Sequence, residues 1–448
     1  MSGSRKVLYF TCITFCIYFS LSLVGTYLGV HYTPFMRVNV VADVFKMDVN
    51  DSITLNKEEA PIAIQQKASY NFSLYRTPHL ITNFNIDTNS AALQQFAKKL
   101  HLLKTTKKGK VRIAFLGDSM IEGDLMTQTL RELMQQYFGG VGVGFVPLAT
   151  PGSGIRTTAY SSITGDWQTT NFKSDDKATL FLSGYKYNTN SGSIKITDHS
   201  FKDSNAVITK SLLFGYMPTA VAINVNDNAL SIYGSNKINK AALLQNNNPQ
   251  INININNKAL DVYGVTFESN DGVFVDNFSF RGISGTEIGK IDSSFLADIN
   301  KANPYDLIVL QYGVNVLYKP NDVNFNYYGK LMLPVVKKIK QCFPSTDVLI
   351  ISTADRAFNY AGTYKSAIGI DSLVKLQANI AYQNNCNFYN QFATMGGTNS
   401  IVDWANRKPA LANKDYVHPN RAGATVLATY FFEALYNDYQ KYTQQLNP

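Results

Sequence analysis

Five positions, far apart along the chain, carry the residue types that acyl transfer requires. Ser119 stands between a short apolar run and a helical pattern, so its hydroxyl is a candidate nucleophile at a strand-to-helix turn. His418 can take its proton, and Asp415, three residues earlier, can orient the imidazole. The backbone N–H groups of Ser119 and Gly285 and the side-chain amide of Asn315 can stabilise a developing oxyanion. This set predicts nucleophilic catalysis through Ser119.

The elements that must position these residues alternate between strand and helix. Short strands are predicted at 111–116, 273–280, 306–313, 347–353 and 386–392, and those at 306–313 and 347–353 are expected to be buried. Helical spacing is found at 89–103, 126–137, 287–302, 328–343, 371–385 and 421–440. This alternation is typical of a parallel sheet covered by helices on both faces. Sites in such sheets form at the carboxyl ends of the strands, and Ser119, Gly285 and Asn315 all follow predicted strand ends.

A different pattern occupies residues 151–275. Charged residues become fewer, and "AINVN" (222–226) and "INININ" (251–256) alternate apolar with polar side chains. Turn signals separate these runs, and no long helical pattern interrupts them. We therefore predict an all-β sandwich or jelly roll, inserted into the α/β domain after its first strand and helix. Trp167 in this module is a candidate for substrate contact, and a scaffold role for the module is the alternative.

The N-terminus contains an uncharged stretch at 7–30, long enough to span a bilayer as a helix. Arg5 and Lys6 precede it and no charge follows before Arg37, which predicts a cytoplasmic N-terminus and an exported body. We expect an uncleaved signal anchor, and a cleaved signal peptide is the first alternative. A buried core helix is the second alternative.

Composition excludes some classes of function. The net charge of +9 is modest for 448 residues, and no basic block has interleaved aromatics, so nucleic-acid binding is not expected. Histidines do not cluster with Cys342 or Cys386, and no metal site or cofactor is expected. These two cysteines are expected as free thiols, with a disulfide as the alternative in an oxidising compartment. Glu122 and Asp124 are expected at a solvated helix start, and Asp118 is expected to bond the turn before it.

The motifs around these residues, in this order, resemble those of the SGNH (GDSL-type) hydrolase superfamily. "GDSM" resembles its first block, Gly285 in "GISG" its second, Gly313-Val314-Asn315 its third, and Asp415-Tyr416-Val417-His418 its D-x-x-H block. Gly282 is the alternative for the second block. The resemblance covers about 110–150 and 275–440. It implies a flavodoxin-like three-layer sandwich with Ser119, His418 and Asp415 as catalytic residues. Ser119, Gly285 and Asn315 would form the oxyanion hole.

The position of the β insert resembles that in peptidoglycan and polysaccharide O-acetylesterases of bacterial envelopes, where the insert is similar to a carbohydrate-binding jelly roll. The resemblance implies an esterase that removes O-acetyl groups from an envelope glycan. It also leaves open an O-acetyltransferase that works with a membrane-bound O-acyltransferase, and a glycan-binding protein without catalysis. The implied location is the bacterial inner membrane, with one span and the catalytic domain in the periplasm.

These expectations divide the chain into four parts. A cytoplasmic tip and transmembrane anchor occupy 1–36, and a tether or arm occupies 37–100. The hydrolase domain is formed by 101–150 and 276–448. The carbohydrate-binding-module-like β insert lies between them, at 151–275.

Overall fold

The computed structural model describes residues 13–14, 17, 20, 71–201 and 205–446. Every sheet among them belongs to the unit Gln65–Pro448. No helix within these ranges is both long enough and apolar enough to cross a membrane. Most of the predicted span at 7–30, and the predicted tether as far as residue 70, lie outside the described residues.

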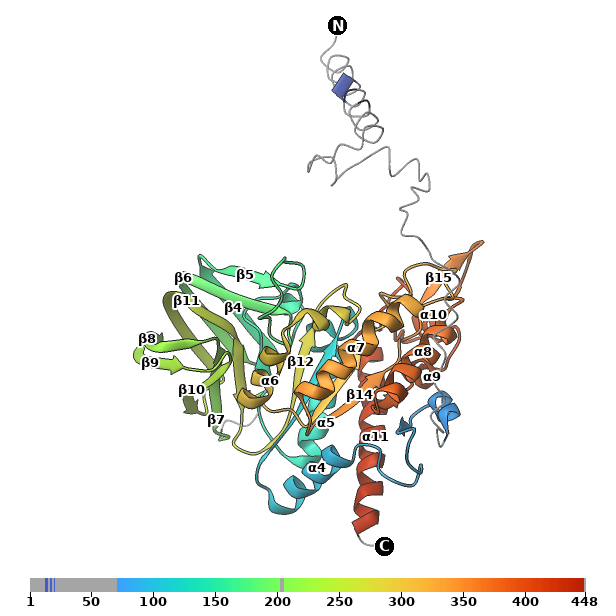
Figure 1. The fold of residues 1–448 in the computed structure, drawn as a ribbon, viewed down its shortest axis with the longest axis horizontal. Coiled ribbons are helices and arrows are strands. Elements are labelled where there is room, and N and C mark those ends of the chain that lie inside the picture. The colour runs from blue at the N-terminus through green and yellow to red at the C-terminus, as the bar shows by residue number, and fades with distance from the viewer. Residues whose placement is uncertain (1–12, 15–16, 18–19, 21–70, 202–204, 447–448) are drawn as a thin grey trace. The chain divides into compact units, whose positions relative to one another are not determined.

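A six-stranded sheet forms the centre of the unit (Figure 1). Its spatial order is β1-β17-β14-β13-β2-β12, and every pairing is parallel except that of β1 with β17. The five parallel strands therefore follow the order 2-1-3-4-5 in the chain, which is the flavodoxin-like arrangement that the resemblance implies. The strands are β1 (Ile81–Thr82), β2 (Lys110–Gly117), β12 (Gly272–Ser279), β13 (Leu307–Gln311), β14 (Asp347–Ile351) and β17 (Asn387–Tyr389).

Helices cover both faces of this sheet because successive side chains of a strand point to opposite sides. In β2, Ile113 and Phe115 join one apolar core, whereas Ala114 and Leu116 join the other. The first core includes side chains of α4 (Gln94–Thr106), α5 (Leu125–Phe138) and α11 (Arg421–Leu446), and the second includes those of α6 (Ser293–Ala302), α7 (Asn326–Cys342) and α8 (Ile370–Gln383). The unit therefore has the predicted helix–sheet–helix layers.

A second sheet of nine strands interrupts the α/β unit between α5 and β12 (Figure 1). All its pairings are antiparallel. The longest strand, β11, pairs with β6 and β8 along its first part and with β7 and β3 near its end, so it links strands that do not pair with one another. The strands are β3 (Gly144–Val146), β4 (Ala159–Gly165), β5 (Gln168–Asn171), β6 (Tyr185–Asp198), β7 (Ile208–Phe214), β8 (Met217–Val225), β9 (Asn228–Gly234), β10 (Asn239–Asn246) and β11 (Gln250–Glu268).

The second sheet begins at residue 144 and ends at residue 268, whereas the β insert was predicted at 151–275. The difference arises because β3 pairs with β11, while β12 begins at Gly272 and returns to the central sheet beside β2. Shorter elements complete the unit: η1 (Phe72–Arg76), η2 (Ser119–Asp124), η3 (Pro151–Gly154), η4 (Thr286–Lys290), the hairpin β15 (Ala357–Tyr360) and β16 (Thr363–Ser366), α9 (Gln391–Met395) and α10 (Ser400–Asn406).

The segment before α4 is built into the α/β unit. β1 extends the central sheet as an edge strand, and Phe84 behind it is buried. Both oxygens of the Asp438 carboxylate in α11 accept hydrogen bonds, from the backbone N–H groups of Ala92 and Leu93. Cys342 and Cys386 are both buried free thiols.

Candidate active site

Ser119 lies at the carboxyl end of β2, where the chain turns sharply into η2. β2 ends at Gly117, and the Asp118 carboxylate then accepts a hydrogen bond of 2.9 Å from the Met120 N–H. This side-chain cap holds the turn, as the sequence predicts for Asp118. Ser119 is the first residue of η2, so its own backbone N–H has no partner within that helix.

His418 and Asp415 reach Ser119 from the loop before α11. The Ser119 hydroxyl lies 2.9 Å from Nε2 of His418, and Nδ1 of the same ring lies 2.8 Å from Oδ2 of Asp415. The other Asp415 oxygen accepts from the backbone N–H groups of Val417 and His418 at 2.9 and 3.0 Å. Nδ1–H donates to Asp415 in this arrangement, which leaves Nε2 free to accept the serine proton.

Asp415 is held in its ionised form. Burial raises the pKa of its carboxyl, but the hydrogen bonds from the His418 amide and ring and from the Val417 amide outweigh this effect, so the pKa lies below its ordinary value. A carboxylate at this place can therefore stabilise the imidazolium that forms when His418 takes a proton.

Asn315 connects the loops around the expected oxyanion hole. Its Nδ2 donates to Oδ2 of Asp118 and to the carbonyl of Ile283, both at 3.0 Å. Both hydrogens of the amide are thus engaged, and Asn315 can serve an oxyanion only by sharing or releasing one of them. Through Ile283 it also holds the loop that contains Gly285.

Gly285 occupies a position that another residue would strain. Its φ is +91°, and a Cβ there would lie 2.6 Å from the Tyr312 ring. It caps η4, and its N–H has no hydrogen-bond partner among the described residues. Gly282 nearby also has a positive φ but open space around it. The packing against Tyr312, next to the Gly313 turn, therefore distinguishes Gly285 from Gly282.

Asp118 is fully buried beside these groups. Burial raises the pKa of its carboxyl to about 7, against the lowering effects of the Met120 N–H, the charge of His418 and the Asn315 amide. The carboxyl therefore contributes to the turn, to the position of Asn315 and to the charge around His418.

The Asp118→Asn variant is expected to keep the turn but lose activity. Its amide oxygen can still accept from Met120, whereas its NH₂ group would face the NH₂ of Asn315 and cannot accept from it. We expect kcat for p-nitrophenyl acetate to fall about 10- to 100-fold, less than when an oxyanion donor is removed outright, with little change in KM. A wild-type kcat in this variant would show that the bond from Asn315 to Asp118 has no role in the reaction.

The same carboxyl is expected to shape the pH profile. As the pH falls through about 7, Asp118 takes a proton, which weakens its bond to Asn315 and removes negative charge near His418. We therefore expect kcat/KM to fall with the pH in this range, and to fall less steeply in D118N, which lacks the carboxyl. Superimposable profiles would show that Asp118 does not change its charge there.

A pocket of about 400 Å³ opens onto the Ser119–His418 pair. Its walls include Glu122, Arg281 and Ile155, none of which the sequence singled out as a site residue. Nε of Arg281 donates to the Glu122 carboxylate at 2.9 Å, and Ile155 is 51% exposed beside them. Arg281 follows the carboxyl end of β12. Because sites in parallel sheets form at these strand ends, this position could have identified Arg281 as a candidate site residue from the sequence.

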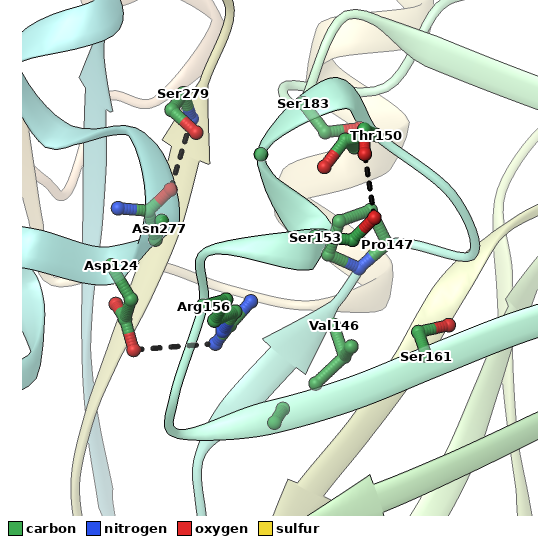
Figure 2. Close-up of a pocket in the computed structure, with 13 residues that line it drawn as sticks. Asp124, Val146, Pro147, Thr150, Ser153, Arg156, Ser161, Ser183, Asn277 and Ser279 are labelled. Atoms are coloured by element: carbon green, nitrogen blue, oxygen red, sulfur yellow. Dashed lines mark hydrogen bonds and ion pairs between the residues drawn. The ribbon is translucent and has the colours of Figure 1, made fainter.

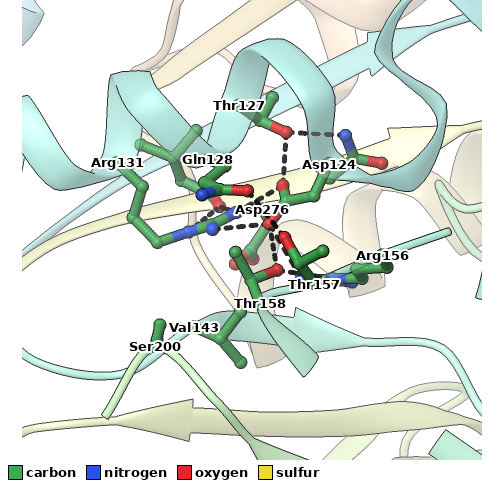
Figure 3. Close-up of polar contacts among 12 residues, drawn as sticks. Asp124, Thr127, Gln128, Arg131, Val143, Arg156, Thr157, Thr158, Ser200 and Asp276 are labelled. Carbon is green, nitrogen blue, oxygen red and sulfur yellow. Dashed lines mark hydrogen bonds and ion pairs between the residues drawn. The ribbon is translucent and has the colours of Figure 1, made fainter. Parts of the chain in front are cut away.

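The prediction of a solvated helix start at Glu122 and Asp124 is wrong, because both residues are buried. Asp124 pairs with Arg131 at 2.7 Å and with Arg156 at 3.5 Å, and Glu122 pairs with Arg281 (Figure 3 shows the Asp124 cluster). These arginines come from α5 and from two distant loops. The acids after Ser119 therefore anchor the segment that carries the nucleophile.

A small cavity of about 20 Å³ lies next to this cluster (Figure 2). Asp124 and Arg156 form part of its wall. Ser153 and Thr150 also line it, and the Ser153 hydroxyl donates a hydrogen bond of 2.6 Å to the Thr150 carbonyl. This volume suffices for about one water molecule. It is too small for a glycan, so the larger pocket at Ser119 is the candidate substrate site.

Trp167 does not line the pocket at Ser119. It follows β4, is half-buried, and donates from Nε1 to the Thr164 carbonyl at 3.1 Å. Tyr185 and Tyr187 of β6 are buried with their rings stacked. Across the ranges that the structure describes, no group of three His, Cys, Asp or Glu side chains is placed to hold a metal ion.

The order of the parallel strands gives this chain a flavodoxin-like α/β fold. The chain resembles the solved structure of a peptidoglycan O-acetylesterase over 80% of its own length and 99% of that protein, with a TM-score of 0.66 and 24% identity. No protein-family model matches the chain, and no curated protein is significantly similar to it.

Two further solved structures are more distant. A family two carbohydrate esterase from Cellvibrio japonicus is 8% identical, with 63% of this chain and 98% of that protein covered and a TM-score of 0.27. An acetyl xylan esterase is 16% identical, with 36% of this chain and 80% of that protein covered and a TM-score of 0.28. Their TM-scores are too low to support an argument, so of these three structures it is the peptidoglycan O-acetylesterase that supports the fold.

Proposed function

We propose that this chain is a serine esterase that removes O-acetyl groups from a cell-envelope glycan through an acyl-Ser119 intermediate. The main support for this proposal is the continuous chain of hydrogen bonds from Ser119 through His418 to Asp415. The fold shared with a peptidoglycan O-acetylesterase supports the choice of an acetylated glycan as substrate.

In the first half of the proposed reaction, the Ser119 oxygen attacks the acetyl carbonyl carbon while Nε2 of His418 takes the hydroxyl proton. The N–H groups of Ser119 and Gly285 stabilise the oxyanion, together with the Asn315 amide, which shares one of its two engaged hydrogens with it. The bond to the sugar oxygen then breaks, His418 returns the proton to that oxygen, and the acetyl group stays on Ser119. In the second half, water activated by His418 releases acetate and restores the serine.

We also propose that the enzyme acts outside the cytoplasm of a bacterium, held to the inner membrane by residues 7–30. The uncharged stretch behind Arg5 and Lys6 supports this placement. Its partners would be the membrane and the acylated glycan.

Acetate release from O-acetylated peptidoglycan sacculi and from acetylated xylan tests this function in the purified chain. Hydrolysis of either polymer that depends on Ser119 supports the esterase. The alternative is transfer to a sugar, with acetyl groups supplied by a membrane-bound O-acyltransferase. Faster acetyl transfer to added glycan than to water would favour it. Glycan binding without turnover in either assay would contradict both enzymatic readings.

A further inference from the structure

We propose that the β insert contains a glycan-binding site around Tyr233, distinct from the catalytic pocket. Tyr233 is 72% exposed at the end of β9, and Tyr216, before β8, is 59% exposed. Met217 pairs with Gly234 and is buried, so the residues that flank this pair point to the solvent side of the sheet. Two aromatic rings are therefore presented to solvent at one end of one hairpin.

A pocket of about 360 Å³ adjoins Tyr233. The turn between β9 and β10 forms one wall, and the second half of α6 in the α/β unit forms the other. Residues with side chains suited to sugar hydroxyls line it: Ser235, Asn236, Lys240, Asp298 and Lys301. It therefore combines an aromatic ring with hydrogen-bond donors and acceptors, which is the chemistry that a pyranose ring requires.

The turn beside Tyr233 is held in place by its own bonds. Nδ2 of the buried Asn239 donates to the carbonyls of Gly215 and Asn236 at 2.9 and 2.8 Å. Lys237 donates to the Ser294 hydroxyl of α6 at 2.7 Å, and Lys240 donates to Asn303 after it at 2.7 Å. The turn beside Tyr233 is thus bonded both within the β insert and to the α/β part of the chain. A binding site that is already held in place loses little conformational freedom when a ligand binds, which favours affinity.

The location indicates a polymeric ligand. The loop after α6 lies beside the start of β2, because the backbone N–H of Arg112 in β2 donates a hydrogen bond to Asp306 in that loop. Ser119 follows the other end of β2, so the two sites are separated by roughly 20 Å along the sheet. One sugar unit cannot reach both. The Tyr233 site therefore takes a remote part of the same glycan chain, an inference that rests on the proposed function.

Tyr233→Ala tests this site in the full chain, with Tyr160→Ala as a matched control. Tyr160 is 51% exposed in the same insert, on β4, and does not line the pocket. We expect Y233A to raise KM for sacculi or acetylated xylan about tenfold and to weaken co-sedimentation with the same polymers. Both variants should hydrolyse p-nitrophenyl acetate like wild type, and Y233F should retain polymer binding because it keeps the ring.

An unchanged polymer KM and co-sedimentation in Y233A would overturn the site, as would an equal loss in Y160A. A loss of p-nitrophenyl acetate hydrolysis in Y233A would also overturn it, because the residue would then act on the catalytic unit. If wild type releases no acetate, the proposed function fails. Co-sedimentation of wild type with a polymer, lost in Y233A, would still support the site, and no co-sedimentation with either polymer would refute it.

Discussion

Replacing Ser119 with alanine is expected to lower kcat for acetyl-ester hydrolysis about 10⁴-fold or more. The serine oxygen lies 2.9 Å from Nε2 of His418 and is the atom that would form the new bond to the acetyl carbon. Alanine leaves His418, Asp415 and the oxyanion donors in place, so the residual rate measures what those groups achieve without a nucleophile. Steady-state kinetics with p-nitrophenyl acetate and with O-acetylated sacculi would measure the loss.

Ser153→Ala provides the matched control. The Ser153 hydroxyl donates to the Thr150 carbonyl beside the small cavity of Figure 2, whereas the His418 ring bonds to Ser119 and Asp415. Its kcat should remain close to the wild-type value. If S119A kept more than a tenth of the activity, Ser119 would be excluded as the nucleophile.

The sequence contained enough information for the central sheet because its signals are local. Buried strands such as 306–313 and 347–353 are continuous apolar runs, and the helices between them have clear spacing. The structure places β13 and β14 within these limits, at Leu307–Gln311 and Asp347–Ile351. Ser119, Asp415 and His418 were identifiable for the same reason, since each belongs to a short motif beside a predicted element.

Strand pairings and buried ion pairs that join residues far apart in the chain could not be predicted from local sequence patterns. The polar alternation of 251–256 predicts a strand, but not that β11 pairs with four different strands. Glu122 and Asp124 read as surface acids because their counter-charges, Arg281 and Arg156, lie far along the sequence. Arg131 is only seven residues from Asp124, yet its burial depends on the packing of α5 against β12, where its guanidinium donates to the Val275 carbonyl at 3.0 Å.

The second large effect is expected from replacing the buried acid Asp124, and it concerns the stability of the fold. Its carboxylate lies between the guanidinium groups of Arg131 and Arg156 and also accepts from the hydroxyls of Thr127 and Thr158 (Figure 3). Burial raises the pKa of Asp124, but the two arginine charges outweigh it, so the pKa lies well below its ordinary value. The acid therefore stays ionised and compensates two buried cations.

Asp124→Asn is expected to lower the free energy of unfolding by about 3–5 kcal/mol, because it leaves buried guanidinium groups without their counter-charge. Asparagine keeps the size of the side chain and tolerates the positive φ of +65° at this position, so the variant isolates the charge. Urea unfolding would measure the change, with Glu132→Ala as the control. Glu132 is an exposed acid of α5, the helix that follows Asp124, and its loss should change stability by less than about 0.5 kcal/mol. A D124N variant as stable as E132A would show that Arg131 and Arg156 do not depend on this carboxylate.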